Sequence, residues 1–333
     1  MRHCEILLPF GLPPSAMAPD LLRNLHAPAL STLLAKAAAP KMRPFDPFAL
    51  CLPHELWLAQ RQGLIRGDNG QNSPPLAASR MQSLGMSAEP GTWFLLHPVH
   101  IHIARDHLVL TDRRRLPLID AESRAFFDTA LAVFENAGKT LRYGSPDTWF
   151  VRADDWANLQ TASPDAACGH NIDIWMPKGE GERAWRKLQN EVQMEWHENP
   201  VNNAREARRD PSVNSLWLWG ASNESSAGTA SPLPSFDSAQ GVQTMLASAQ
   251  PEVLTVLDNL SETALAEEWG GWLESIQQLD QHWFAPLLDA LKSGKVAQLT
   301  LVLSHNTQLR EFNLAKSSFM KFWARPSLNR LAP

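Results

Sequence analysis

The sequence is poor in the features that mark several protein classes. Its 333 residues include three widely spaced cysteines and no CxxC pair, so neither a disulfide framework nor a zinc knuckle is indicated. No run approaches the roughly 20 apolar residues that a membrane helix needs. No basic run suggests a groove that tracks phosphates, and the net charge is −5, which argues against a nucleic-acid surface spread over the whole chain. Residues 1–20 lack the long apolar stretch of a signal peptide, so we expect a cytoplasmic protein.

Common catalytic and nucleotide-binding motifs are also missing. The sequence contains no P-loop, GxSxG, GxGxxG or HExxH pattern. Tyrosine occurs once, whereas tryptophan occurs 13 times. Because large aromatic side chains mostly pack in protein interiors, a tryptophan-rich core is favoured over an aromatic ligand cage.

The pattern of apolar segments predicts an α/β protein. Apolar residues make up 44% of the chain and charged residues 20%, which is typical of a globular protein. In the last third, two apolar runs, 253–258 and 299–304, flank a helical stretch, as expected for strands of a parallel βαβ unit. The middle is rich in strands, with candidates at 93–110 and 140–152 and a helix between them at 120–136.

The segment from 181 to 239 has clear signals for a helix, a strand and a loop. Apolar residues recur at helical spacing from Gly181 to Glu198, and Pro200 disfavours helical geometry at the residue before it. Residues 213–219 form an apolar run that predicts a strand buried on both faces. A short strand at 171–175 and a loop at 221–239 complete this prediction.

Candidate ligand-binding residues lie between this helix and this strand. If residue 203 onward is helical, Arg205 and Arg208 lie one turn apart on one face, and two adjacent guanidinium groups suit a phosphate or a carboxylate. Asn202 and Asn214 could hold backbone or ligand groups through their amides. The alternative is a structural link with capping asparagines and solvated arginines, and the spacing alone does not separate the two.

A histidine-rich stretch is the second candidate site. His97, His100 and His102 lie in HPVHIHIARDH, where His100 and His102 would share one face of a strand. With Asp106 they could hold zinc or manganese. The alternative that they line a strand face is favoured, because a metal site needs three or more converging ligands. His305 follows a predicted parallel strand, where ligands of open α/β sheets often bind.

Beyond single motifs, much of the chain resembles one bacterial family. The words NPVNNAREARRDPSVNSLWLWG, HPVHIHIARDHLVL and GHNIDIWMPKGEGERAWRKLQNEVQM resemble those of RpfE-type regulatory proteins, also described as phosphoglycerate-mutase-related proteins. LHAPALSTLLAKA, LDQHWFAPLLDALKSGK and FMKFWARP extend the resemblance toward both ends. A more distant similarity is to archaeal-type cofactor-independent phosphoglycerate mutases of the alkaline phosphatase superfamily.

The resemblance implies a particular architecture. It implies an alkaline-phosphatase-like core, with a mostly parallel sheet flanked by helices, formed by residues 1–90 and 211–333. A smaller α+β domain, residues 91–210, would be inserted in this core.

The superfamily works through two metal ions, and this sequence departs from its ligand motifs. Pro9–Gly11 (PFG) stands where an Asp-Gly motif is expected, and ALAEEWGGW stands where an Asp/Gly/His cluster is expected. Ser304–His305 replaces an Asp-His pair. The nearer family's HPVN histidine is Asn199 here, and its glycine after the second arginine is Arg209, which would strain a turn with positive φ.

These departures lead to two functional hypotheses. The first is a catalytically inactive relative without a cofactor, which has a regulatory or ligand-binding role. The alternative is a metal-dependent mutase or phosphotransferase whose manganese or zinc site is rearranged; its candidate ligands are His97, His100, His102, Asp106 and His305. Expected partners are a small phosphorylated or carboxylate ligand or another protein, and neither nucleic acid nor a membrane.

Overall fold

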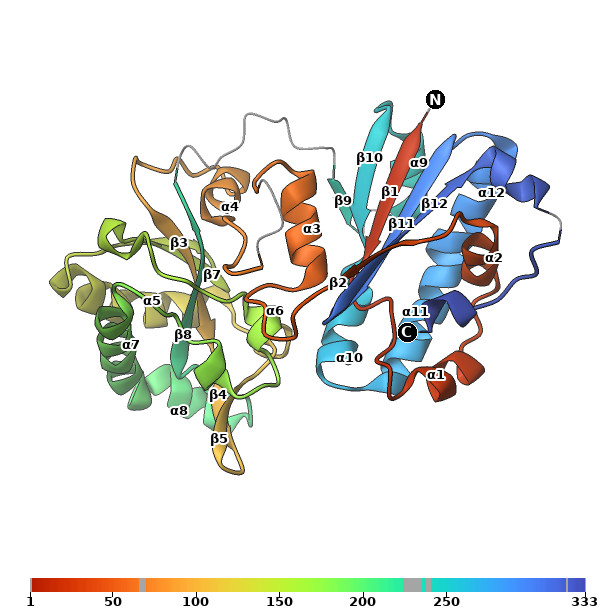
Figure 1. Ribbon diagram of the computed structural model, residues 1–333. Coiled ribbons are helices and arrows are strands. Elements are labelled where there is room, and N and C mark those ends of the chain that lie inside the picture. Colours follow the sequence, from red (N-terminus) through yellow and green to blue (C-terminus); the bar gives the residue numbers. More distant parts are fainter. Residues whose placement is uncertain (1, 66–69, 224–234, 238–240, 322, 333) are drawn as a thin grey trace. The chain divides into compact units, whose positions relative to one another are not determined.

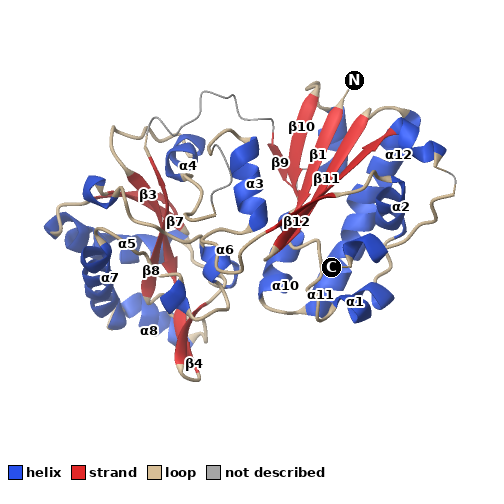
Figure 2. Ribbon diagram, in the orientation of Figure 1, coloured by secondary structure: helices blue, strands red, loops and turns tan. Residues whose placement is uncertain are grey.

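The computed structural model describes residues 2–65, 70–223, 235–237, 241–321 and 323–332. The chain forms two compact units (Figure 1). Residues 1–47 and 231–333 form one, here called the split unit, and residues 48–230 form the other, the continuous unit. Both contain helices and strands, so the chain is a mixed α/β protein (Figure 2). Among the described residues, no helix is both long and apolar enough to cross a bilayer.

The split unit is built on one six-stranded sheet. Its strand order is β2-β12-β11-β1-β10-β9, and the strands are β1 (His3–Leu8), β2 (Lys41–Pro44), β9 (Ser235–Asp237), β10 (Glu252–Val256), β11 (Gln298–His305) and β12 (Gln308–Ala315). β1 runs parallel to both β10 and β11, and β10 runs parallel to β9. The two apolar runs of the last third are therefore parallel strands of one sheet, with β1 between them.

The sheet as a whole is mixed, because an antiparallel edge adjoins its parallel strands. β11 turns back into β12 through only two residues, and β12 pairs antiparallel with both β11 and β2. Such a short connection joins antiparallel neighbours, whereas parallel strands need a long crossover. The tight turn after residue 305 gives no periodicity signal of its own, so the antiparallel edge was not expected from the sequence.

Helices from both ends of the chain pack in the split unit. They are α1 (Ala18–Asn24), α2 (Pro28–Lys36), α9 (Gly241–Ala247), α10 (Ser261–Leu265), α11 (Trp269–Leu279) and α12 (Ala285–Ser293). A π-helical turn, Asp280–Phe284, joins α11 to α12. The carboxylate of Asp280 accepts hydrogen bonds from the Ala29 and Leu30 amides at 3.1 and 2.7 Å, so it caps the first turn of α2 from another element.

The continuous unit contains a four-stranded antiparallel sheet and a separate two-stranded ribbon. The sheet order is β6-β7-β3-β8, with β3 (Trp93–Val99), β6 (Thr140–Ser145), β7 (Thr148–Arg152) and β8 (Ser215–Ser222). The ribbon pairs β4 (Ile101–Ala104) with β5 (His107–Leu110). The helices are α3 (Pro53–Arg61), α4 (Ala77–Ser83), α5 (Asp120–Asn136), α6 (Pro164–Ala167), α7 (Glu182–His197) and α8 (Pro200–Ala207).

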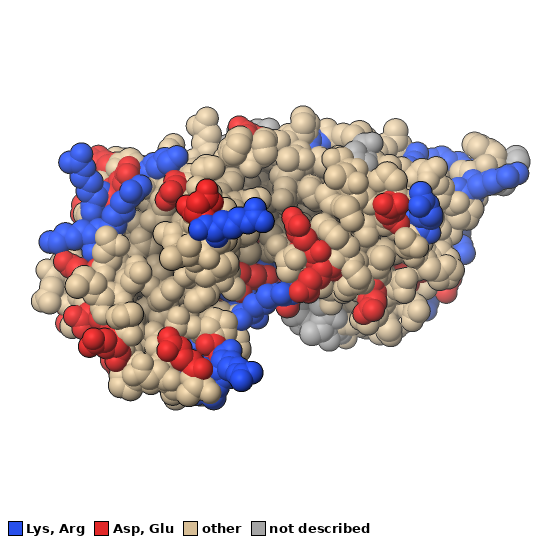
Figure 3. All heavy atoms as spheres, turned by 90° about the horizontal axis from the view of Figure 1, so that it is seen from below, with Lys and Arg blue, Asp and Glu red and all other residues tan. Residues whose placement is uncertain are grey.

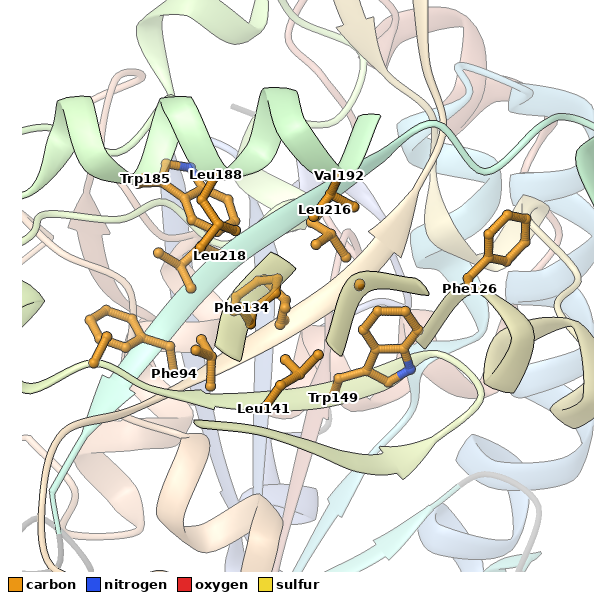
Figure 4. Close-up of a cluster of buried hydrophobic side chains, with 14 of the residues drawn as sticks. Phe94, Phe126, Phe134, Leu141, Trp149, Trp185, Leu188, Val192, Leu216 and Leu218 are labelled. Atoms are coloured by element: carbon orange, nitrogen blue, oxygen red, sulfur yellow. The ribbon is translucent and has the colours of Figure 1, made fainter. Parts of the chain in front are cut away.

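Tryptophans pack together with phenylalanine, leucine and valine side chains in the core of this unit (Figure 4). Trp149 from β7 packs edge-to-face against Trp196 of α7, with ring centroids 5.9 Å apart, and Trp185 of the same helix is also fully buried. The indole N–H groups of Trp149 and Trp196 donate to Ser123 Oγ and the Phe126 carbonyl. The role of tryptophan as packing residue is therefore confirmed for this cluster.

The helix expected at 181–198 is present as α7, and its predicted face is the buried one. The prediction of a strand at 171–175 is wrong. A 3-10 turn, Ile172–Ile174, stands there, because the Asn171 side chain accepts a hydrogen bond from the Asp173 amide and closes a turn. Much of the loop expected at 221–239 lies outside the described residues.

The units differ in extent from the expected core and insert. β8 pairs with β3, and α3 and α4 also belong to the continuous unit, so its bounds are 48 and 230 rather than 91 and 210. An apolar run predicts a buried strand, but it does not tell which sheet the strand joins. That choice depends on long-range pairing, which no local pattern encodes.

Candidate functional site

The first candidate site is the carboxyl edge of the parallel strands in the split unit. β1 ends at Leu8 and is followed by Pro9–Gly11, the segment that replaces the Asp-Gly motif. Phe10 is buried and has a φ of 55°, the left-handed conformation that non-glycine residues rarely adopt. Its amide donates to Ser304 Oγ at 3.3 Å, and its carbonyl accepts from the Trp272 indole at 2.9 Å.

The backbone groups at this edge are therefore bonded to other residues of the protein. The Leu12 amide also donates to the Ser304 carbonyl at 3.0 Å, which ties the loop after β1 to the end of β11. A Cβ on Gly11 would lie 2.6 Å from the Leu8 side chain and 2.9 Å from the Leu303 side chain, so the segment has no room for a larger residue. The packing leaves Phe10 and Ser304 as interior residues.

The metal pair implied by the resemblance does not fit the residues at this edge. Phe10 offers no ligand atom in its side chain, and the Asp258 carboxylate after β10 accepts a hydrogen bond from the Ser261 hydroxyl. His305, at the end of β11, is partly buried, and burial lowers the pKa of its imidazole. Over the described part of the chain, no three His, Cys, Asp or Glu side chains converge as a metal ion requires.

The second candidate site is the segment between α7 and β8. Asn202 is buried and joins the two ends of this segment. Its amide donates to the carbonyls of Trp196 and Val213, both at 2.9 Å, and its oxygen accepts from the Val213 amide at 2.8 Å. Asn214 makes a similar pair of bonds to the backbone of Ile101, at 2.7 and 2.8 Å.

The two arginines share one carboxylate, and it belongs to the protein. Arg205 Nη1 and Arg208 Nη2 each lie 2.5 Å from an oxygen of Glu122, in the first turn of α5. Arg205 is fully buried and also donates to the carbonyls of Pro211 and Pro117. Arg208 is half exposed and also pairs with Asp210 at 3.1 Å. Both guanidinium groups therefore meet one anion, and that anion is the carboxylate of Glu122.

These contacts give all four candidate residues partners inside the protein. Asn202 and Asn214 complete backbone hydrogen bonds, and the arginine charges are balanced by Glu122 and Asp210. A phosphate- or carboxylate-binding role for Asn202, Arg205, Arg208 and Asn214 stays a prediction, and the geometry favours the structural alternative.

Arg209 occupies the position expected for a glycine. Its φ is 65°, so the strain expected from the sequence is present. The Arg209 amide donates to the Glu206 carbonyl, and the Asp210 amide donates to the Arg205 carbonyl. This is the Schellman arrangement at the end of α8, whose left-handed position is usually glycine.

The histidines of the third candidate site are divided among separate surroundings. His97 lies on β3, and its Nδ1 bonds to the Asp147 carbonyl at 2.5 Å; burial lowers its pKa to about 3. His100 and His102 stack on one face, as expected, with ring centroids 5.9 Å apart. Their Nδ1 atoms bond to the Ser212 carbonyl and to Thr111 Oγ1.

The other two metal candidates do not join that pair. Asp106 lies in the turn between β4 and β5 and bonds to His107 at 3.0 Å. His305 lies at the end of β11 in the split unit. The structure therefore brings together only His100 and His102 of the five candidates.

A buried polar network in the continuous unit was not expected from the sequence. Glu55, on α3, accepts hydrogen bonds from the Ser163 hydroxyl at 2.5 Å and the Leu52 amide at 2.7 Å. Burial, aided by the charge of Asp165, raises the pKa of Glu55 to about 7, and burial lowers the pKa of His54 to about 4. Arg114 holds Asp165 through two hydrogen bonds of 3.1 and 2.6 Å. The one feature of the sequence that could have indicated this polar network is the run of three arginines, Arg113–Arg115.

The surface seen in Figure 3 carries charges of both signs, and over the described residues of that face they are interspersed. Among the residues described on that face, basic side chains form no broad patch.

The comparisons with known proteins complete the description of the site. No protein-family model matches the sequence, and no curated protein matches it. The structure is similar to that of the PH0037 protein from Pyrococcus horikoshii, with a TM-score of 0.54 at 12% identity, covering 94% of this chain and 87% of that one. It also aligns with a cofactor-independent phosphoglycerate mutase from Thermoplasma acidophilum DSM 1728, with a TM-score of 0.41 at 13% identity, covering 94% and 89%. The second score is too low to support an argument, and the first shows a similar mixed α/β fold and nothing about activity.

Proposed function

We propose that this chain acts by binding a ligand or partner in a regulatory role, and not by two-metal phosphoryl transfer. The observation that carries the proposal is the closed carboxyl edge of β1. In open parallel sheets, ligands bind outside the carboxyl ends of the strands. Here that position holds Phe10, whose amide and carbonyl are both bonded by Ser304 and Trp272.

The chemistry of the missing side chains supports the same proposal. A two-metal site needs several converging carboxylates and imidazoles to hold both ions and align the phosphoryl oxygens. Pro9–Gly11 contributes none, and Ser304 is fully buried and unable to meet a substrate. The resemblance of residues 199–220 to RpfE-type regulatory proteins agrees with a regulatory role, although the alkaline-phosphatase-like ancestry that it implies is part of the proposal.

Metal content and turnover together test this proposal. The purified full chain is loaded with manganese or zinc, dialysed, and its metal measured by mass spectrometry; 3-phosphoglycerate turnover is followed in a coupled assay. An active cofactor-independent phosphoglycerate mutase serves as the control. We expect far less than one tightly bound ion per chain and no turnover above the protein-free rate.

Manganese- or zinc-dependent turnover would overturn the proposal in favour of a rearranged metal site. The variants His97→Ala and His305→Ala then locate that site, because loss of both metal and turnover in one of them identifies a ligand. His282→Ala, which changes an exposed histidine on the π-helical turn, is the matched control.

A further inference from the structure

A groove in the continuous unit lies beside the β4–β5 ribbon, and of the candidate-site residues described above only Asn214 and its partner Ile101 line it. It has a volume of about 390 Å³ and is bounded by the ribbon, by α7 and by the 3-10 turn Ile172–Ile174. The ribbon projects at the lower end of its unit in Figure 1. All of the lining residues belong to the continuous unit.

The outer edge of β4 faces away from β5. The Thr111 amide donates to the His100 carbonyl, so the even-numbered residues of this strand bond to β5. Alternate residues of a strand point their backbone groups to opposite sides. The amide and carbonyl of Ile101 and Ile103 therefore point outward, away from β5.

The side chain of Asn214 already pairs with part of this outer edge. Its amide group bonds both the carbonyl and the amide of Ile101, as the backbone of a neighbouring strand would. Ile103 is the next residue with the same orientation, and within the described residues its amide and carbonyl have no hydrogen-bond partner. Asn214 therefore pairs with the outer edge of β4 at Ile101, and the backbone groups of Ile103 on the same edge are available for pairing.

The side chains around the open edge are apolar and exposed. Ile103 is 76% exposed, and Leu108, its partner across the ribbon, is 42% exposed. Ile172, which is buried, and Met176, which is half-buried, also line the groove. Exposed apolar side chains that gather beside an open strand edge are typical of an interaction site.

The opposite wall is formed by side-chain amides. Asn190 and Gln193 line it from α7 beside Gln189, whose amide nitrogen already donates to Ser215 Oγ and the Leu216 carbonyl. The charged lining residues, Arg186 and Asp173, have opposite signs. An amide-lined wall of no net charge matches the amide chemistry of a peptide backbone and offers little to a phosphate or another strongly charged ligand.

From these features we propose that the groove binds an extended peptide segment of a partner protein. The segment pairs with the Ile103 backbone as an added strand, and it places an aliphatic side chain between the apolar ribbon face and α7. The inference deepens the proposed binding role, on which it rests, by naming the class of partner and its site.

Selection from a random octapeptide phage library against the full chain tests the proposal. We expect enrichment of peptides with an aliphatic residue at alternate positions, because side chains on one face of a strand recur every second residue. The enriched peptide is then synthesised, and its affinity is measured by fluorescence anisotropy. Ile103→Asp should weaken binding at least tenfold, whereas Met194→Asp should not, although Met194 on α7 is also 76% exposed.

Two measurements separate strand pairing from adhesion to an apolar surface. Methylation of the peptide amide that pairs with Ile103 should abolish binding, and hydrogen exchange at residues 101–104 should slow when peptide is bound. No enrichment, or binding equally strong to Ile103→Asp, would overturn the proposal. A concentration-dependent dimer that Ile103→Asp dissociates would also overturn it, since the occupant would be a second copy of this chain. None of these outcomes alters the metal and turnover result that tests the proposed function.

Discussion

At the scale of single residues, Arg205 is a buried charge whose partners all lie within the protein. Its guanidinium is fully buried and bonds to Glu122 and two backbone carbonyls. Pro117 and Glu122 lie around the start of α5 and Pro211 lies before β8, so this one side chain joins α8 to both segments. Removing one member of a buried ion pair leaves the other charge without compensation.

Arg205→Ala should therefore lower the free energy of unfolding by about 3–5 kcal/mol, measured by urea denaturation. Arg208→Ala is the matched control, since it removes the half-exposed partner of the same carboxylate and should cost much less. An Arg205→Ala variant of normal stability that no longer binds phosphate would instead support the anion-binding prediction.

Glu55 gives a second test, through pH. Burial raises its pKa from 4.5 to about 7, so its protonated form is favoured in the folded state. Its contribution to stability is present below pH 4.5 and is lost as pH rises through 7. His54 and His97, whose pKa values fall from 6.5 to about 4 and about 3, contribute above pH 6.5 and lose this contribution as pH falls through those values.

Glu55→Gln should remove only the loss of stability that ionisation of Glu55 causes as pH rises. We expect its urea midpoint to rise relative to the unsubstituted protein between pH 5 and pH 8, because glutamine cannot ionise but can still accept a hydrogen bond from the Leu52 amide. Glu195→Gln changes an exposed carboxylate on α7 and serves as the control. A stability difference that does not vary with pH would contradict the assignment.

At the scale of elements, the end of α8 carries strain that its hydrogen bonds maintain. Arg209 is held in the left-handed conformation by the Schellman bonds to the last turn of the helix. That conformation costs a non-glycine residue roughly 1–2 kcal/mol.

Arg209→Gly should accordingly raise the free energy of unfolding by about 1 kcal/mol, because the relieved strain exceeds the extra entropy of glycine in the unfolded chain. Its matched control is Arg208→Gly, one residue earlier at a φ of −90°, which should destabilise α8. Equal effects at the two positions would show that φ does not decide the outcome.

At the scale of the whole molecule, the continuous unit is the part whose elements are adjacent in sequence. Its sheet, its tryptophan core and the Arg205 contacts all lie between residues 48 and 230. The split unit, in contrast, needs β1 from the start of the chain between β10 and β11 from its end.

A fragment of residues 48–230 should consequently fold by itself. We expect a cooperative thermal transition and the near-ultraviolet circular dichroism of packed tryptophans. The shorter fragment 91–210, which follows the boundaries expected from the sequence, lacks β8 and should remain unfolded, because β3 then loses one of its two partners. A cooperative transition in the shorter fragment would count against the observed division.

Sequence patterns predicted the mixed α/β class, the helices α5 and α7, the strands β8, β10 and β11, the buried face of α7, the packing role of the tryptophan cluster and the shared face of Arg205 and Arg208. These features follow from periodicity, capping and residue size, which act over a few residues. Four other features became known only from the folded chain: Glu122 is the anion between the arginines, β8 pairs with β3, β12 pairs antiparallel with β11, and Glu55 is buried near the charge of Asp165. Each depends on segments distant in sequence, whose pairing is decided by which surfaces pack together and exclude water, and no local pattern records that choice.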